Sequence, residues 1–164
     1  MIRAIVDDLA FIEADAVLRP ADASLEPVTA AAVRLDRQAG PRFAEQRRLT
    51  FPLEAGAAVI TPAGDLTAGY VLHVVIQDPQ TLTTRDTVRR ALLAAWQQAA
   101  EWGLGAIAAA PVGAGAGLLD VEDAVELTSE TFPRDASHPG RLTIVVDRAE
   151  DLAPAEAAIR RAGR

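Results

Sequence analysis

The sequence contains no cysteine, no lysine and no asparagine, and each absence limits what the protein can do. Without cysteine there are no disulfides, thiolate metal sites or cysteine nucleophiles, which agrees with a cytoplasmic protein. All 16 basic residues are therefore arginines, and the net charge of −7 argues against general binding to nucleic acid.

Long apolar runs and export signals are also missing. The uncharged stretch of residues 103–119 contains five glycines and a proline, so it is a poor membrane span. The opening residues MIRAIVDDLAF lack the charged-then-apolar pattern of a signal peptide. We therefore expect neither membrane insertion nor export.

The residues that are present indicate one folded domain over residues 1–164. Half of the residues are hydrophobic, which is enough for a sizeable core in a chain of this length. Alanine occurs 35 times, so single alanines carry little information about function.

Strand-like and helix-like segments alternate along the chain. Strands are predicted at Ile2–Val6, Asp15–Leu18, Ala57–Thr61, Tyr70–Ile76, Ala106–Ala110 and Arg141–Val146. Helices are predicted at Pro27–Ala39, Thr84–Trp102, Val121–Thr131 and Pro154–Ala162, with Pro27 in the first turn of its helix. This alternation predicts an α/β fold, a three-layer α/β/α sandwich with a mixed, mostly parallel sheet.

The loop PVGAGAG, residues 111–117, lies between a predicted strand and a predicted helix. Glycines at 113, 115 and 117 would let ligand oxygens approach the backbone N–H groups, and the helix N-terminus would attract a phosphate. The loop matches neither the Walker pattern nor G-x-G-x-x-G. A small-residue turn in an alanine-rich protein is the alternative interpretation.

Several stretches together resemble the macro domain family across essentially the whole chain. DDLAFIEADAVLRPADASL resembles the family's G-D-I-T opening followed by D-A-I-V-N-A-A-N-S-x-L, and RQAGPRF resembles R-A-A-G-P. AGAAVITPAGDLTAGYVLHVV is similar to G-E-A-V-I-T-x-G-x-N-L-x-x-x-Y-V-I-H, which is the most specific part of the match. AIAAAPVGAGAGLLDVEDAVEL resembles A-F-P-x-I-x-T-G-x-x-G-x-P-x-E-x-A.

The resemblance implies a site for ADP-ribose or a similar nucleotide. Asp8 falls where the family has the acidic residue that accepts the adenine amino group, and a carboxylate suits that role. The residues that it implies for ligand binding are Asp8, Leu9, Asp22, Gly113, Ala114, Gly115, Ala116 and Gly117.

The first loop departs from the family pattern. The family's second asparagine, which faces the distal ribose and is catalytic in hydrolases, aligns with Asp22. Glu26 and Pro27 lie in the segment EPVTA that replaces the following glycine run, and Asp36 stands at the position of a histidine found in one hydrolytic branch. The aromatic residue that often stacks on adenine after the last strand is Asp147 here. No catalytic residue is therefore assigned.

Other candidate sites are weaker. His73 lies in an apolar strand and is interpreted as a buried, hydrogen-bonded core histidine, while His138 lies in a loop far along the chain. This spacing predicts no metal site. Arg42, Arg47 and Arg48 form a basic cluster that either recruits an anionic group or forms a solvated face.

Three functions stay open at this point. The first is a non-catalytic module that weakly binds ADP-ribose or a related nucleotide diphosphate, without a cofactor. The second is a ligand-free macro-fold scaffold for a protein partner or for a homo-oligomer. The third is an ADP-ribosyl hydrolase or O-acetyl-ADP-ribose deacetylase, which would need Asp22 or Asp36 to position a water.

Overall fold

A computed structural model describes residues 1–115, 118–134 and 140–164. A six-stranded sheet lies at its centre, with strands in the order β1-β6-β5-β2-β4-β3. The strands are β1 Ile2–Val6, β2 Ala16–Asp22, β3 Ala58–Pro62, β4 Tyr70–Gln77, β5 Ala106–Ala109 and β6 Arg141–Val146. Neighbouring strands are parallel except for β3, which pairs antiparallel with β4 at one edge. The predicted mixed, mostly parallel sheet is confirmed.

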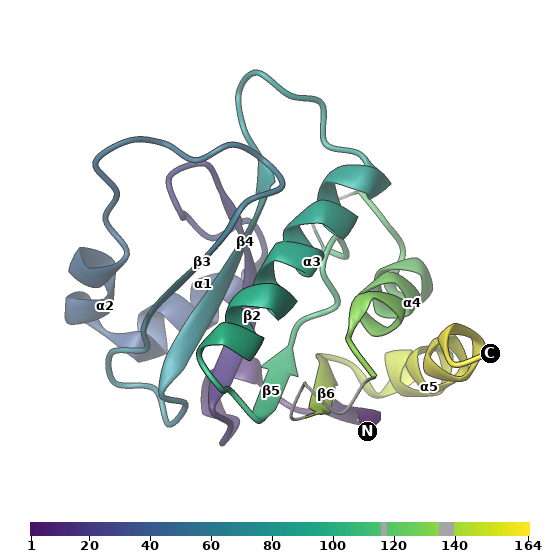
Figure 1. Ribbon diagram of the computed structural model, residues 1–164. Coiled ribbons are helices and arrows are strands. Elements are labelled where there is room, and N and C mark those ends of the chain that lie inside the picture. Colours follow the sequence, from purple (N-terminus) through teal and green to yellow (C-terminus); the bar gives the residue numbers. More distant parts are fainter. Residues whose placement is uncertain (116–117, 135–139) are drawn as a thin grey trace.

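Helices cover both faces of the sheet, as the ribbon in Figure 1 shows. The helices are α1 Ala30–Ala39, α2 Pro41–Gln46, α3 Arg85–Glu101, α4 Val121–Thr131 and α5 Leu152–Ala162, with 3-10 turns at Leu9–Phe11 and Ala149–Asp151. One hydrophobic core lies between the sheet and α3, α4 and α5. A second, smaller core lies between the opposite face and α1, α2 and the first 3-10 turn. The predicted three-layer sandwich is therefore confirmed.

The long helix α3 follows its apolar pattern closely. Val88, Leu92, Ala95, Trp96 and Ala99 recur at three- and four-residue spacing, and all five are buried against the sheet. Thr84 begins the helix as part of a capping box, because its hydroxyl accepts the N–H of Thr87. The predicted range Thr84–Trp102 exceeds the helix by one residue at each end.

The segment between β2 and α1 differs from its prediction. Helix α1 begins at Ala30, where the Thr29 hydroxyl accepts the N–H of Ala32, rather than at Pro27. Pro27 instead forms an isolated antiparallel bridge with Ala21, so the chain folds back on the end of β2. The predicted helix start was wrong because the proline stabilises this return and a better cap follows two residues later.

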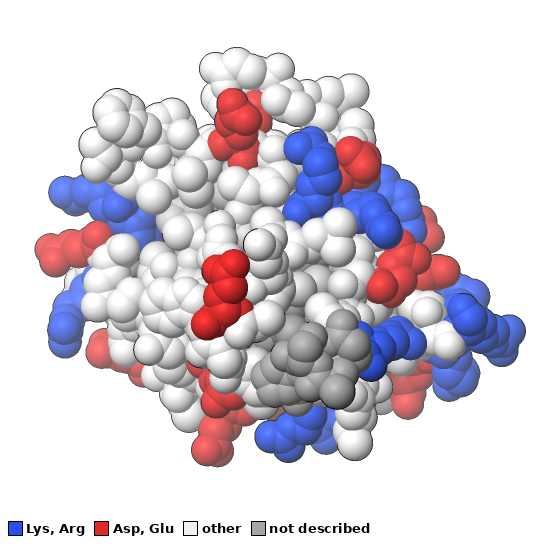
Figure 2. All heavy atoms as spheres, viewed as in Figure 1, with Lys and Arg blue, Asp and Glu red and all other residues white. Residues whose placement is uncertain are grey.

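The arrangement of strands determines where a ligand could bind. The five parallel strands end at the same edge of the sheet, where open α/β sheets bind their ligands. In Figure 2, blue and red side chains lie close together toward the right of the view, while the centre of this face is mostly white. The ion pairs Arg161–Glu126 and Arg89–Glu130 link neighbouring helices. Among the described residues, no helix is long and apolar enough to cross a membrane.

Candidate functional site

A cleft of about 300 Å³ opens at the carboxyl edge of the parallel strands. This volume is at the low end of the roughly 300–1,000 Å³ of small-molecule sites. Its walls come from residues far apart in the sequence. They are Leu9, Pro20, Thr29, Ala30, Ala31, Ala110, Pro111, Ala114, Gly115, Val121, Val145, Val146, Asp147, Arg148 and Asp151.

The first residues of two helices contribute to the cleft wall. Ala30 and Ala31 begin α1, and Val121 begins α4. Backbone N–H groups in a first helical turn have no acceptor within the helix and carry part of the positive end of the helix dipole. The two helix starts therefore suit an anionic group, although Glu122 and Asp123 in the first turn of α4 reduce that attraction.

The glycine loop contributes through Ala114 and Gly115. Gly115 has φ +76, and a Cβ added there would lie 3.5 Å from the Cγ2 atom of Thr29, so the loop touches the start of α1. Gly113 is buried instead, because the side chain of Leu119 occupies the space where its Cβ would be. The predicted site residues Ala116 and Gly117 lie outside the described residues.

The predicted adenine contact, Asp8, lies beside the cleft wall formed by Leu9. One carboxylate oxygen of Asp8 accepts the N–H of Ala10, and the other lies 3.4 Å from the Nε atom of Arg34. The Nη2 atom of Arg34 also lies 3.0 Å from the carboxylate of Asp147. Arg34 thus bridges the two acids at this end of the cleft, and each oxygen of Asp8 already has one partner.

Asp22 does not line the cleft. Its Oδ1 atom accepts the backbone N–H groups of Ser24, at 2.8 Å, and Glu26, at 2.9 Å. The backbone N–H of Leu25 donates to the Asp22 carbonyl, and Leu25 takes a left-handed φ of 62°. The Asp22 carboxylate therefore stabilises a tight turn at the end of β2.

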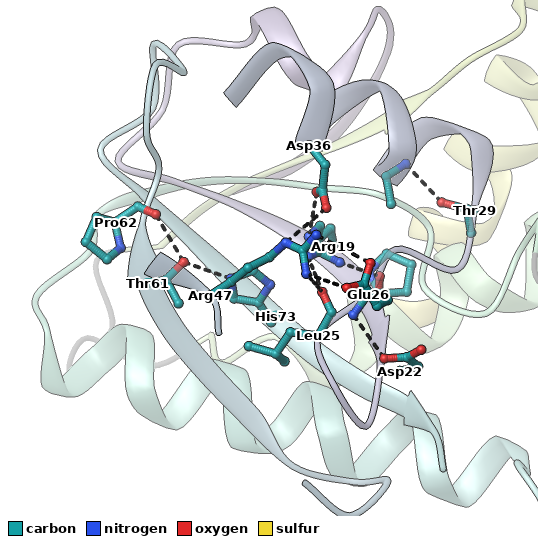
Figure 3. A network of polar contacts seen from close by, with 12 residues as sticks. Arg19, Asp22, Leu25, Glu26, Thr29, Asp36, Arg47, Thr61, Pro62 and His73 are labelled. Carbon is teal, nitrogen blue, oxygen red and sulfur yellow. Dashed lines mark hydrogen bonds and ion pairs between the residues drawn. The ribbon is translucent and has the colours of Figure 1, made fainter. Parts of the chain in front are cut away.

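Beneath this turn lies a cluster of charged residues that the sequence did not predict (Figure 3). Arg19, on β2, is completely buried, and its Nε atom lies 3.1 Å from the carboxylate of Asp36 on α1. Arg47 contacts the other oxygen of Asp36 at 3.4 Å and reaches Glu26 at 3.1 Å. We call Arg19, Glu26, Asp36 and Arg47 the four-charge cluster.

The cluster also fixes the backbone of the turn. The Nη2 atom of Arg19 donates to the Leu25 carbonyl at 2.6 Å, and Arg47 donates to the same oxygen at 3.2 Å. Leu25 itself is fully buried against Ala21 and Val75. The loop that follows β2 is thus held from below by two guanidinium groups and by its own apolar side chain.

Burial dominates the protonation of these groups. It lowers the pKa of Arg19 to about 10, against the opposing effect of Asp36. Burial raises the pKa of Asp36, and the two arginines partly offset this shift. Arg19 and Asp36 lie 3.1 Å apart, and their mutual attraction opposes the effect of burial on both pKa values.

His73 lies next to the cluster on β4 and is fully buried, as predicted. Its Nε2 atom forms a hydrogen bond of 2.8 Å with the Thr61 hydroxyl. Its ring stacks on Phe43, and the guanidinium of Arg19 lies over the same Phe43 ring. Burial and then the positive charges of Arg19 and Arg47 lower its pKa well below the usual value. His73 is therefore a neutral core residue.

The sequence contained a faint signal of this cluster. Arg19 interrupts the apolar strand AVL just before a proline, which is an unusual place for a charged residue. The interpretation of Arg42, Arg47 and Arg48 as a solvated face is wrong for Arg47, whose side chain is only 12% exposed. Arg42 and Arg48 are exposed, as expected of a solvated face.

Comparison with known families and sequences agrees with this geometry. Residues 19–128 match the family model of the Macro domain. An uncharacterized protein from Mycobacterium tuberculosis is 30% identical over 139 residues, which cover 85% of this chain and 38% of that protein. An uncharacterized protein from Aeropyrum pernix is 32% identical over 117 residues, which cover 71% of this chain and 62% of that protein. The chain thus spans well under half the length of its mycobacterial relative.

Solved structures share the fold at low sequence identity. The Trypanosoma brucei macrodomain in complex with ADP-ribose has a TM-score of 0.82 and 16% identity, over 96% of this chain and 68% of that one. The same macrodomain in complex with ADP has a TM-score of 0.83 and 17% identity, with the same coverage. A variant of the Oceanobacillus iheyensis macrodomain with ADP-ribose has a TM-score of 0.80 and 16% identity, over 96% of this chain and 91% of that one.

Proposed function

The chain belongs to the macro domain family, and from this premise we propose that it binds ADP-ribose or a related nucleotide diphosphate without catalysing a reaction. One observation carries the proposal: the starts of α1 and α4 face a single cleft beside the loop at Ala114 and Gly115. Two helix N-termini and a loop without bulky side chains form a surface that suits a diphosphate.

The two ends of the cleft suit the two ends of a nucleotide differently. Leu9, Val145 and Val146 offer apolar surface for a base beside the carboxylate of Asp8. Ala30, Ala31 and Gly115 offer backbone near the opposite wall, where phosphates would lie. The adenosine part would therefore lie toward β1 and β6, and the phosphates toward α1.

We infer that binding is weak. Asp147 lines the cleft where the family often has an aromatic residue, and base stacking on an aromatic ring is worth roughly 1–3 kcal/mol. Asp147 and Asp151 also add negative charge near the ligand, which Arg34 and Arg148 balance only in part. A dissociation constant near 100 µM, about −5.5 kcal/mol, is consistent with a site of this kind.

The positions of two acids support a non-catalytic role. Asp22 uses one oxygen to hold the turn from Asp22 to Glu26, and Asp36 is held between two arginines. These are the two residues that a hydrolase or deacetylase mechanism would need for positioning water. A general base must reach the attacking water with a free lone pair in the correct place, and neither carboxylate lines the cleft.

The scaffold hypothesis remains the second candidate. It is favoured by the collapse of the first loop onto the four-charge cluster, which leaves Asp22 away from the cleft. It predicts a partner protein or a second copy of the chain instead of a nucleotide. The open cleft between α1 and α4 is the feature that it does not explain.

Calorimetric titration with ADP-ribose tests the proposal directly. We expect a dissociation constant at or below ~100 µM for the native chain and loss of most of the heat in Ala114→Glu, which places a carboxylate in the cleft wall. Ala100→Glu, on the exposed side of α3, is the matched control and should bind normally. If millimolar ADP-ribose gives neither heat nor a thermal shift, the binding function is wrong.

A further inference from the structure

We propose that the cleft recognises only the nucleoside-diphosphate part of its ligand, so that ADP-type ligands bind as tightly as ADP-ribose. This inference rests on the proposed function and makes it more specific. It concerns the far end of the cleft, next to the turn that follows β2. There the turn from Asp22 to Glu26 is fixed by the four-charge cluster.

The two loops approach each other at the cleft wall. Thr29, before α1, and Gly115, in the second loop, are in near contact, since an added Cβ on Gly115 would lie in van der Waals contact with Thr29. None of residues 22–28 lines the cleft, although they connect β2 to α1 directly beside it. A ligand that fills the described cleft therefore has no surface of this loop against which to place a further sugar.

Moving the turn from Asp22 to Glu26 toward a ligand would also be unfavourable in free energy. Both guanidinium groups of the four-charge cluster donate to the Leu25 carbonyl, and the Asp22 carboxylate accepts two N–H groups of its own turn. Removing Leu25 from its pocket would expose a fully buried side chain and take away the carbonyl to which both Arg19 and Arg47 donate. Buried charges without partners are among the most unfavourable groups in a protein.

The chemistry of this end of the cleft opposes a terminal sugar as well. Pro27 has no N–H to donate, and the backbone N–H groups of Ser24 and Glu26 already donate to the Asp22 carboxylate. Glu26 is paired with Arg47 rather than directed to the cleft. Ser24 and Glu26 are exposed, but neither lines the cleft, so hydroxyl groups beyond the second phosphate would remain in water rather than bind this loop.

Parallel titrations with ADP-ribose, ADP and AMP provide the test. We expect ADP and ADP-ribose to bind with dissociation constants within about threefold of each other, and AMP to bind more weakly because it lacks the second phosphate. ADP-ribose binding at least tenfold tighter than ADP would overturn the inference while leaving the proposed function intact. Absence of binding by all three would overturn both.

Proton saturation-transfer NMR on the ADP-ribose complex supplies a second readout that needs no variant. Saturation should transfer to the protons of adenine and of the adenosine ribose. The protons of the terminal ribose should receive less than about a third of the saturation that the adenine protons receive. Equal transfer to both riboses would show that the protein contacts the terminal sugar, and the inference would then be wrong.

Discussion

The Nε atom of Arg19 lies 3.1 Å from the Oδ1 atom of Asp36, and this contact joins strand β2 to helix α1. Both residues stand at positions where the family pattern has other residue types. Arg19 also donates to the carbonyl of Leu25, so the pair is linked to the turn that follows β2.

Breaking this pair from one side should be costly. We expect Asp36→Ala to lower the free energy of unfolding by about 3–5 kcal/mol, because it leaves the buried Arg19 without its carboxylate partner. Arg19→Ala should lower it less, because Asp36 keeps its contact with Arg47. The double variant Arg19→Met with Asp36→Leu should lose less than either single change, since no charge is then left alone. Urea denaturation followed by circular dichroism measures all three.

The exposed pair Arg90–Asp86 on α3 is the control for that series. Its side chains are 55% and 75% exposed, so Asp86→Ala should change stability by less than about 1 kcal/mol. Equal losses for the buried and the exposed pair would contradict the role assigned to burial.

His73 should make stability depend on pH just below neutrality. Burial holds its pKa well below the ordinary value of 6.5, so below that pH the unfolded chain takes up a proton that the folded chain refuses. The free energy of unfolding should therefore fall as pH decreases from about 6.5 to the lowered pKa, by up to ~1.4 kcal/mol per pH unit. The raised pKa of Asp36 acts in the opposite sense, because the folded chain then binds that proton first.

Urea melts between pH 7.5 and 5 can isolate the contribution of His73. His73→Gln should show a flatter dependence than the native chain, and His138→Gln, which changes the only other histidine, should keep the native slope. Identical slopes in the native chain and in His73→Gln would rule out this explanation.

Asp8 should contribute to ligand affinity. If its carboxylate accepts the adenine amino group, Asp8→Ala should weaken ADP-ribose binding about three- to tenfold, which corresponds to the ~0.5–1.5 kcal/mol of one net hydrogen bond. Asp8→Asn keeps an acceptor oxygen both for this contact and for the N–H of Ala10, so it should retain most of the affinity. Calorimetry of Asp7→Ala, at the exposed neighbouring acid, is the matched control.

The two tryptophans should differ sharply in their importance for stability. Trp96 is buried, donates to the Thr131 hydroxyl at 3.0 Å and packs edge-on against Phe132. Trp96→Phe should cost about 2–3 kcal/mol through a lost hydrogen bond and a partly empty space in the core. Trp102 is 55% exposed, so Trp102→Phe should cost less than about 1 kcal/mol in the same chemical denaturation experiment.

Much of the fold was readable from the sequence because it depends on local patterns. The apolar run in β4 and the three- and four-residue spacing in α3 determine which sides of these elements are buried, and both predictions were confirmed. The start of α1 was misplaced by three residues because Pro27 is compatible with either a helix start or a return of the chain.

The candidate site was only partly readable. Leu9, Ala114 and Gly115 line the cleft, Asp8 lies next to it, and neither Asp22 nor Gly113 lines it. That these residues bind a ligand stays a prediction. The sequence by itself determined the alternation of strands and helices and the absence of asparagine, and thereby the loss of the usual first-loop amide. Only the tertiary structure decided which acidic residues pair with Arg19 and Arg47. These partners are brought together by the packing of α1 and α2 on the sheet rather than by any local pattern.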